Sequence, residues 1–227
     1  MIPTRYDVTD RPTFHVLLLR HGQTDANATG VLQGHLPVPL NELGLLQARR
    51  LAGRVARHVP KVTAVVSSDL VRAAQTTEPI AAACGLAPSY DPAWRERGFG
   101  AFEGKFVGER DTWRAAHGDT DPPGAESLAD FRARVRRAIE TLPEAYRIHR
   151  CVAVVTHGGP VGVVLRMLAD GTLPLSPGTD APHVPQVPNC SVLELIRETT
   201  PAGATWRIGC VNDVAHLDAL ASDTDSG

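Results

Sequence analysis

Two histidine-containing segments and a distant arginine have the chemistry to bind and transfer a phosphate group. The segments are Arg20-His21-Gly22 and Thr156-His157-Gly158, and Arg72 lies between them in the sequence. Neutral imidazole can act as a nucleophile toward phosphorus, and arginine guanidinium groups bind two phosphate oxygens at once. Glycine beside each histidine lets backbone N–H groups approach the same oxygens. These residue types together predict a site for a phosphate dianion.

Each histidine segment, and the segment Ser67–Arg72, begins where an apolar run of strand length ends. The runs are Val16–Leu19, Val62–Val66 and Val152–Val155. Helical patterns separate them, and this alternation predicts an α/β fold with a mostly parallel sheet and helices on both faces. Ligands of such sheets bind beyond the carboxyl ends of the strands, so we expect the three segments to meet at one edge of the sheet.

The remaining elements are predicted from the periodicity of apolar residues and from capping residues. Asn41 is placed to cap a helix that runs toward Val59, and Ser68 or Asp69 to cap a helix that ends at Gly85. Further predictions are helices over Glu126–Leu142 and Val161–Leu168, strands over Val192–Ile196 and Trp206–Val211, and a loop through the proline-rich residues 174–201. Four arginines of the helix over Glu126–Leu142 are interpreted as a solvated face: Arg132, Arg134, Arg136 and Arg137.

The composition is that of a globular protein. The chain has 227 residues, of which 43% are hydrophobic, and a formal net charge of −2. We expect a single domain over residues 14–218, with flexible tails at 1–13 and 219–227. The slightly acidic balance argues against non-specific nucleic-acid binding, and no apolar stretch suits a transmembrane helix or a secretory signal. The sequence therefore predicts a cytoplasmic enzyme without a nucleic-acid or membrane partner.

Other catalytic classes find little support in the sequence. The nine histidines show neither HxH nor HExxH spacing, and the P-loop pattern GxxxxGK[ST] is absent. The segment Gly98–Gly104 superficially resembles a dinucleotide-binding fingerprint, but its third glycine is one residue late and no convincing strand precedes it. The sequence therefore favours phosphohistidine chemistry, with no metal and no cofactor.

The segment Leu17–Thr24, together with Asn27, resembles the signature of the histidine phosphatase superfamily, the phosphoglycerate mutase-like proteins. The resemblance covers roughly residues 15–217 and continues through collinear blocks. These blocks are Gln33-Gly34, Pro39–Ala48, Ser67–Thr76, Arg95–Gly104, Gly124–Ser127 and Thr156–Gly159. It implies a three-layer αβα sandwich of the phosphoglycerate mutase-like fold. Departures from the family's pattern at Pro37, Trp94 and Phe102 affect the substrate-facing rim and not the phosphate-binding residues.

The resemblance also implies a role for each site residue. His21 is expected to be the phosphorylated nucleophile, and Glu96 the acid that protonates the leaving alkoxide and then deprotonates the attacking water. The phosphoryl oxygens are expected to be bound by Arg20, Asn27, Arg72 and His157. Candidate substrate-binding residues are Gln33, Gly34 and Gly158.

Three functions stay open on the sequence. A phosphomonoesterase acting on a small phosphorylated metabolite is favoured over a phosphoglycerate mutase, because the family's mutases carry a long insertion and only 61 positions separate Glu96 from His157. A phospholigand-binding module without turnover is disfavoured because both His21 and Glu96 are present. The leaving group stays open, as does assembly into a homodimer. One set of residues would favour an acidic substrate if it reached the site: Arg110, Arg114 and His117.

Overall fold

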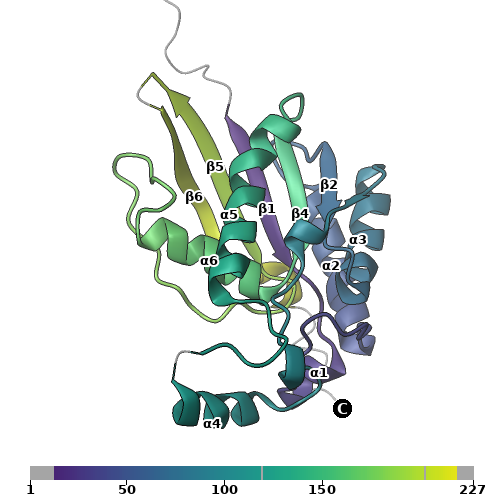
Figure 1. Cartoon of the computed structure of the whole chain (residues 1–227). Coiled ribbons are helices and arrows are strands. Elements are labelled where there is room, and N and C mark those ends of the chain that lie inside the picture. The colour runs from purple at the N-terminus through teal and green to yellow at the C-terminus, as the bar shows by residue number, and fades with distance from the viewer. Residues whose placement is uncertain (1–12, 119, 202, 219–227) are drawn as a thin grey trace, which may run out of the picture.

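A mixed six-stranded sheet forms the centre of the molecule (Figure 1). The computed structural model describes residues 13–118, 120–201 and 203–218. Within them the strands are β1 (Phe14–Arg20), β2 (Ala64–Ser67), β3 (Ser89–Tyr90), β4 (Cys151–Thr156), β5 (Val192–Thr200) and β6 (Gly203–Asp213). They lie in the order β3-β2-β4-β1-β5-β6, and the neighbouring pairs from β3 to β1 are parallel. β5 is antiparallel to both of its neighbours, so the sheet is mostly parallel, as predicted, but not purely so.

Helices cover both faces of the sheet, which gives the predicted three layers. α2 (Glu42–Ala56) and α3 (Val71–Cys84) pack on one face, and α5 (Leu128–Ala145) and α6 (Gly158–Ala169) pack on the other (Figure 1). Two shorter helices, α1 (Asp25–Thr29) and α4 (Val107–His117), lie beyond the lower edge of the sheet in Figure 1. Single turns of 3₁₀ helix are η1 (Pro92–Trp94), η2 (Gly100–Phe102) and η3 (Ala215–Leu217).

Strand β1 shows why the strands are continuous apolar runs. Val16 and Leu18 belong to the core that contains α5 and α6, whereas Leu17 and Leu19 belong to the core that contains α2 and α3. All four side chains are at most 1% exposed. Because successive side chains of a strand point to opposite faces, a strand that lies between two helical layers is apolar at every position. Each such burial stabilises the fold by roughly 1.5–3 kcal/mol.

Most predicted elements are found close to their predicted bounds. Asn41 caps α2 by accepting a hydrogen bond from the backbone N–H of Gly44, and Gly85 ends α3 in the left-handed conformation. The predicted loop over residues 174–201 is found only in 174–191, which contain no helix and no strand beyond one isolated bridge. Its last part is strand: β5 continues past the predicted end at Ile196 to Thr200, because it pairs with β6 along its length. The predicted tails at 1–13 and 219–227 lie outside the described residues, apart from Thr13. No described helix has both the length and the apolar character needed to cross a membrane.

The predicted cap of α3 is wrong. Leu70 occupies the cap position, and no side chain accepts a capping hydrogen bond there. Both predicted caps have partners from distant parts of the chain. Ser68 Oγ lies 2.8 Å from His157 Nε2, and the carboxylate of Asp69 is paired with the guanidinium group of Arg95. Tertiary contacts therefore replaced the local capping preference at this helix end.

The Glu194 carboxylate is shared by two histidines. It lies opposite Leu17 in the middle of β1, away from the strand ends that carry His21 and His157. Glu194 Oε1 is 3.2 Å from His58 Nε2 and 3.0 Å from His15 Nδ1, and His58 is 7% exposed. The hydrogen bond that His58 donates to Glu194 raises the pKa of His58, and the same bond lowers the pKa of Glu194 to about 2. The pKa of the neighbouring Cys151 thiol is raised by burial to about 12, so the thiol stays neutral.

We expect this cluster to give the protein a stability maximum in mildly acidic solution. The raised pKa of His58 contributes stability that is fully present below about pH 6.5 and is lost as the pH rises through the folded-state value. The lowered pKa of Glu194 contributes stability that is present above about pH 4.5 and is lost as the pH falls toward 2. Glu194→Gln should therefore lower the free energy of unfolding by about 1–2 kcal/mol between pH 4.5 and 6.5, after allowance for solvent screening. Urea unfolding of both proteins across pH 3–9 measures the difference, and a difference independent of pH would contradict the assignment.

Candidate active site

His21 follows the last residue of β1 and is held as a neutral imidazole with one unprotonated ring nitrogen. Its side chain is 2% exposed, and its Nδ1 lies 2.7 Å from the carbonyl oxygen of Gly22. That carbonyl can only accept, so Nδ1 carries the proton and Nε2 keeps its lone pair. Burial, followed by the charges of Arg72 and Arg20, lowers the pKa of His21 well below its usual value. The imidazole is therefore an unprotonated nucleophile at neutral pH.

Two arginines surround this imidazole. Arg72 comes from the first turn of α3, is 1% exposed, and donates from Nε to His21 Nε2 over 3.3 Å. Its other nitrogens donate to the carbonyl oxygens of Gly34 and Leu36, which fix the plane of the guanidinium group. Burial lowers the pKa of Arg72 to about 10, which leaves it cationic at neutral pH. Arg20 ends β1, and one of its terminal nitrogens donates to the carbonyl oxygen of Val187.

His157 is placed beside His21 by the parallel pairing of β4 with β1. Their ring centroids are 5.0 Å apart, and His157 is fully buried. Its Nε2 is 2.8 Å from Ser68 Oγ, which sits at the end of β2. We assign the Ser68 hydroxyl as the donor in this bond, because it already accepts from the backbone N–H of Leu70 and its own proton has His157 Nε2 as the acceptor within reach. The proton of His157 is then on Nδ1.

Three buried polar atoms at this edge lack a hydrogen-bond partner within the described part of the chain. They are Arg20 Nε, His157 Nδ1 and Gln33 Oε1. The first two are donors close to His21: Arg20 adjoins it in the chain, and the ring of His157 lies 5.0 Å from its ring. Buried donors without partners are rare in proteins and indicate that a ligand completes them. An oxyanion bound next to His21 would accept from both.

Asn27, in α1, faces the same place and is oriented by a residue that the sequence did not single out. Asn27 Oδ1 accepts from the backbone N–H and the hydroxyl of Thr24, and from the side-chain amide of Asn189. Asn189 also donates to the carbonyl oxygen of His21. With its oxygen occupied in this way, Asn27 presents its N–H₂ group as the donor.

Glu96 reaches the site from the loop after η1. Its two carboxylate oxygens accept separate backbone hydrogen bonds, from Arg97 N–H over 2.9 Å and from Gly159 N–H over 3.0 Å. The loop itself is held by Arg134, whose guanidinium group donates to the carbonyl oxygens of Ala93, Arg95 and Glu96. The interpretation of Arg134 as part of a solvated helix face is therefore wrong. It is half-buried and paired with Glu126, because the loop that carries Glu96 packs against α5.

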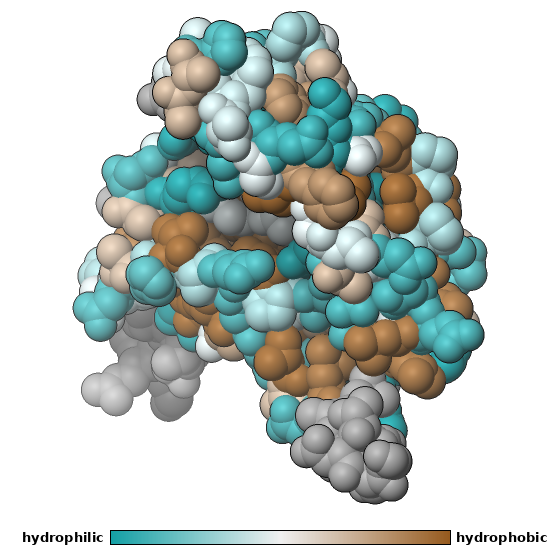
Figure 2. All heavy atoms as spheres, turned by 90° about the horizontal axis from the view of Figure 1, so that it is seen from below, coloured by the Kyte–Doolittle hydropathy of each residue, from teal (hydrophilic) through white to brown (hydrophobic). Residues whose placement is uncertain are grey.

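A pocket of about 300 Å³ opens at the carboxyl edge of the sheet and contains most of the predicted site residues. The predicted site residues that line this pocket are Arg20, His21, Asn27, Gln33, Gly34, Arg72 and Glu96. His157 lies behind His21 and does not line the pocket itself, and Gly158 lies beside Arg20. Figure 2 views the molecule from this side, where hydrophilic and hydrophobic residues lie next to one another.

Several functional contacts had no signal in the sequence pattern. Asn189 belongs to the proline-rich loop, and the carbonyl group of Val187 in the same loop accepts from Arg20. Gln186 lines the pocket as well. The loop residues 186–189 are thus part of the site, although the sequence left the role of the proline-rich segment open. A polar Asn directly after a proline was the one available hint.

The two glycines after His157 have different neighbours, which yields a matched pair of variants. A β-carbon at Gly159 would lie 1.8 Å from Glu96 Oε1, whereas one at Gly158 would meet nothing closer than Arg20 Nε at 3.5 Å. Gly159→Ala should displace the carboxylate and lower kcat for an alkyl phosphate by about 100-fold, the usual effect of misplacing a catalytic group by about 1 Å. Gly158→Ala should change kcat by no more than about twofold. Steady-state kinetics of both variants tests this, and equal losses would show that Glu96 is not the group affected.

The described residues contain no cluster of three histidine, cysteine, aspartate or glutamate side chains arranged to hold a metal ion. The chemistry at this edge is carried by imidazole, guanidinium, amide and one carboxylate. Such a set binds a dianion and offers it a nucleophile and a group for proton transfer.

Comparisons with known proteins agree with this geometry. The sequence pattern of the histidine phosphatase superfamily (branch 1) matches residues 16–213. Phosphoglycerate mutase-like protein 4 of Arabidopsis thaliana is 35% identical over 228 residues, covering 96% of this chain and 93% of that protein. A probable phosphoglycerate mutase of Yersinia pestis is 33% identical over 218 residues, covering 92% of this chain and 97% of that protein.

Solved structures with the same fold include two named phosphatases. A mycobacterial glucosyl-3-phosphoglycerate phosphatase, solved with VO3, has a TM-score of 0.73 and 28% identity and covers 88% of this chain and 99% of its own. An Escherichia coli protein titled a putative alpha-ribazole-5'-P phosphatase has a TM-score of 0.69 and 25% identity and covers 88% of this chain and 96% of its own. The resemblance read from the sequence blocks is thus confirmed. The chain belongs to the histidine phosphatase superfamily, branch 1.

Proposed function

We propose that this protein is a phosphomonoesterase that works through a phosphohistidine on His21 and needs no metal. The observation that carries the proposal is the unprotonated His21 Nε2, whose one hydrogen bond within the described residues is a long one of 3.3 Å from Arg72, together with two buried donors without partners, Arg20 Nε and His157 Nδ1. The substrate of the proposed enzyme is a small phosphorylated metabolite of the cytoplasm. Membership in the superfamily, whose named relatives are phosphatases and mutases, supports phosphoryl transfer as the reaction class.

The first chemical step would transfer the phosphoryl group from substrate to enzyme. The lone pair of His21 Nε2 forms the N–P bond while the bond from phosphorus to the leaving oxygen breaks. Protonated Glu96 gives its proton to that oxygen, so the product leaves as a neutral alcohol. Arg20, Arg72 and His157 would stabilise the negative charge on the three equatorial oxygens, which is the main protein contribution to phosphoryl transfer.

The second step would hydrolyse the phosphoenzyme. Glu96, now a carboxylate, takes a proton from a water molecule as the water oxygen bonds to phosphorus and the N–P bond breaks. Inorganic phosphate leaves, His21 recovers its lone pair, and Glu96 is protonated again. The backbone hydrogen bonds from Arg97 and Gly159 hold Glu96 in place for both transfers. The same carboxylate therefore serves as acid and then as base.

The pocket lining supports a phosphatase over a phosphoglycerate mutase. Among the described residues that line it, Arg20 and Arg72 are the only cationic side chains, and both are committed to the phosphoryl group. A phosphoglycerate also carries a carboxylate, which would be buried there without a counter-charge. Arg110, Arg114 and His117 do not line the pocket; they lie on α4, where Arg110 pairs with Asp111.

The same lining favours an uncharged leaving group with an apolar part. The lining includes five side chains without polar atoms: Ala26, Val31, Leu32, Phe99 and Val107. It also includes the neutral amides of Gln33 and Gln186, which can hydrogen-bond hydroxyl groups. The proposed substrates are therefore phosphate monoesters of neutral alcohols such as sugars or nucleosides.

A matched pair of substrates tests this proposal. Glycerol 3-phosphate and 3-phosphoglycerate differ by a hydroxymethyl group against a carboxylate. With excess EDTA present, we expect phosphate release from both, with kcat/KM at least about tenfold higher for glycerol 3-phosphate because the carboxylate would be desolvated without a partner. Conversion of 3- to 2-phosphoglycerate faster than phosphate release would show a mutase instead. Tight phosphate binding with no turnover of any monoester would show a binding module, and loss of activity in EDTA would contradict the metal-free mechanism.

A further inference from the structure

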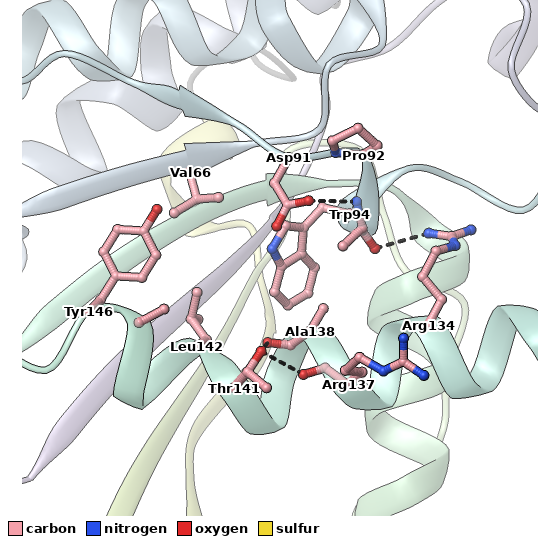
Figure 3. A pocket seen from close by; sticks show the side chains of 12 residues that line it. Val66, Asp91, Pro92, Trp94, Arg134, Arg137, Ala138, Thr141, Leu142 and Tyr146 are labelled. Atoms are coloured by element: carbon pink, nitrogen blue, oxygen red, sulfur yellow. Dashed lines mark hydrogen bonds between the residues drawn. The ribbon is translucent and has the colours of Figure 1, made fainter.

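A second cavity, of about 450 Å³, lies outside the active site between η1 and α5 (Figure 3). Its volume is in the range of small-molecule sites. Trp94 stands between the segment Asp91-Pro92 and the helix, with Val66 and Leu142 toward one side. The other lining residues that matter for its chemistry are Arg134, Arg137, Ala138 and Tyr146.

The cavity presents hydrogen-bond donors that the protein does not use. Trp94 is 1% exposed, and its indole N–H makes no hydrogen bond to any described residue. The Arg137 guanidinium group likewise has no ion pair or hydrogen bond within the described part of the chain. Asp91, by contrast, already accepts from the backbone N–H of Ala93. The indole N–H is therefore open to the cavity, where the acceptor of a bound molecule would complete it.

The arrangement of these groups defines the class of molecule that would fit. Figure 3 shows the guanidinium groups of Arg134 and Arg137 at one end of the cavity and the Tyr146 ring at the other, with the flat indole of Trp94 between them. Tyr146 is engaged with Ser89 through its hydroxyl. The middle of the cavity is apolar and one end is cationic. A flat apolar body that carries one anionic group matches both features.

The walls of this cavity also hold the loop that carries Glu96. The carbonyl oxygen of Trp94 accepts from the hydroxyl of Thr156 over 2.7 Å, at the end of β4 directly before His157. Arg134, at the cationic end, donates to the carbonyl oxygens of Arg95 and Glu96. Arg134 is also paired with Glu126, so an anion in the cavity does not draw it from the loop. Trp94 directly precedes Arg95 and Glu96 in the chain, so a ligand that moves the indole changes the free energy of holding Glu96 in place.

We propose that this cavity is an effector site for a small aromatic carboxylate, and that its occupation loosens Glu96. The carboxylate binds Arg137 at the cationic end, the aromatic body lies against the Trp94 indole and displaces it, and the loop that continues from Trp94 to Glu96 moves with it. The site is separate from the phosphate pocket, so the effector does not compete with substrate. The effector changes the proton transfer by Glu96 and leaves in place the residues that bind the phosphoryl oxygens: Arg20, Arg72 and His157.

Binding is tested with naphthalene-1-acetate, and with its uncharged isostere naphthalene-1-acetamide, by ¹H–¹⁵N NMR of the full chain. We expect naphthalene-1-acetate to shift the Trp94 indole N–H signal, and the backbone N–H signal of Gly159, which donates to Glu96. The amide isostere should bind at least about fivefold more weakly, the effect of one lost charge-assisted hydrogen bond. No shift at Trp94, or equal binding of the two probes, would overturn the proposal. A Trp94 signal that moves with protein concentration alone would identify the cavity as a self-association surface instead.

Neighbouring arginines of α5 supply matched variants. Arg137→Ala should weaken naphthalene-1-acetate binding at least about fivefold, whereas Arg136→Ala, which removes an exposed arginine paired with Glu140, should leave it within about twofold. Ala138→Leu fills the apolar middle and should abolish binding. An unchanged amide spectrum away from the cavity shows that each variant is folded. Binding that survives both Arg137→Ala and Ala138→Leu would place the probe elsewhere and refute the assignment.

The expected effect of the effector on catalysis rests on the proposed function, and it is measured separately from binding. Saturating naphthalene-1-acetate should lower kcat for glycerol 3-phosphate at least about fivefold without raising KM in proportion, and the loss should be absent in Arg137→Ala. If the protein turns over no phosphate ester, the proposed function fails while the NMR shifts at Trp94 and Gly159 still test the site. If turnover occurs and the bound probe changes neither kcat nor the Gly159 signal, the effector proposal fails alone.

Discussion

Replacing His21 with alanine is expected to lower kcat for p-nitrophenyl phosphate by about four orders of magnitude or more. The variant loses the atom that forms the N–P bond, and removing a covalent nucleophile is among the largest single effects in enzyme catalysis. The loss cannot be made up by water, because the surrounding arginines position the phosphoryl group for His21 Nε2. Phosphate binding itself should persist, since Arg20, Arg72 and Asn27 are unchanged.

The intermediate gives a more direct measurement of the same prediction. Rapid quenching of the native enzyme with ³²P-labelled substrate should yield an alkali-stable, acid-labile phosphoprotein, and mass spectrometry should place the label on the peptide that contains His21. His21→Ala should yield none. His149→Ala is a suitable control, because His149 bonds Thr63 at the other end of the molecule. A label on any other residue, or full activity of His21→Ala, would falsify the phosphohistidine mechanism.

The second large effect is expected for Glu96→Gln, and it should depend on the leaving group. Alkyl alkoxides are strong bases and need a proton, so kcat/KM for glycerol 3-phosphate should fall by about 1,000-fold. p-Nitrophenolate is a weak base that leaves without one, so kcat/KM for p-nitrophenyl phosphate should fall much less. The glutamine keeps the shape of the side chain and accepts a backbone hydrogen bond in the same place. The difference between the two substrates therefore isolates the proton.

The same variant should also reveal the second step. Hydrolysis of the phosphoenzyme needs Glu96 as a base, so Glu96→Gln should release one equivalent of p-nitrophenolate in a burst and then turn over slowly. Stopped-flow absorbance measures the burst against the enzyme concentration. Equal losses of kcat/KM for both substrates, with no burst, would show that Glu96 positions the substrate and does not transfer a proton.

The place of the candidate site and the strands that carry it could be predicted from the sequence. His21, Arg72 and His157 each follow an apolar run closely, and parallel pairing of β1, β2 and β4 brings the ends of those runs together. This prediction is possible because a strand that is buried on both faces is a continuous apolar run in the sequence, and because parallel strands end at the same edge of the sheet. The direction of β5 was not available in this way, since an apolar strand reads the same in either direction.

What only the tertiary structure decided is how each site residue is held. Asn189 orients Asn27, although 162 positions of the sequence separate them. Arg134 supports the loop that carries Glu96 from 38 positions away. Gly159 leaves the space that the Glu96 carboxylate fills. The Trp94 cavity belongs to the same class of feature. None of these leaves a period or a spacing in the chain, because each depends on which surfaces the packed helices bring into contact. The sequence by itself determined the reacting groups and the edge where they meet, whereas their orientation is a product of long-range packing and hydrogen bonding.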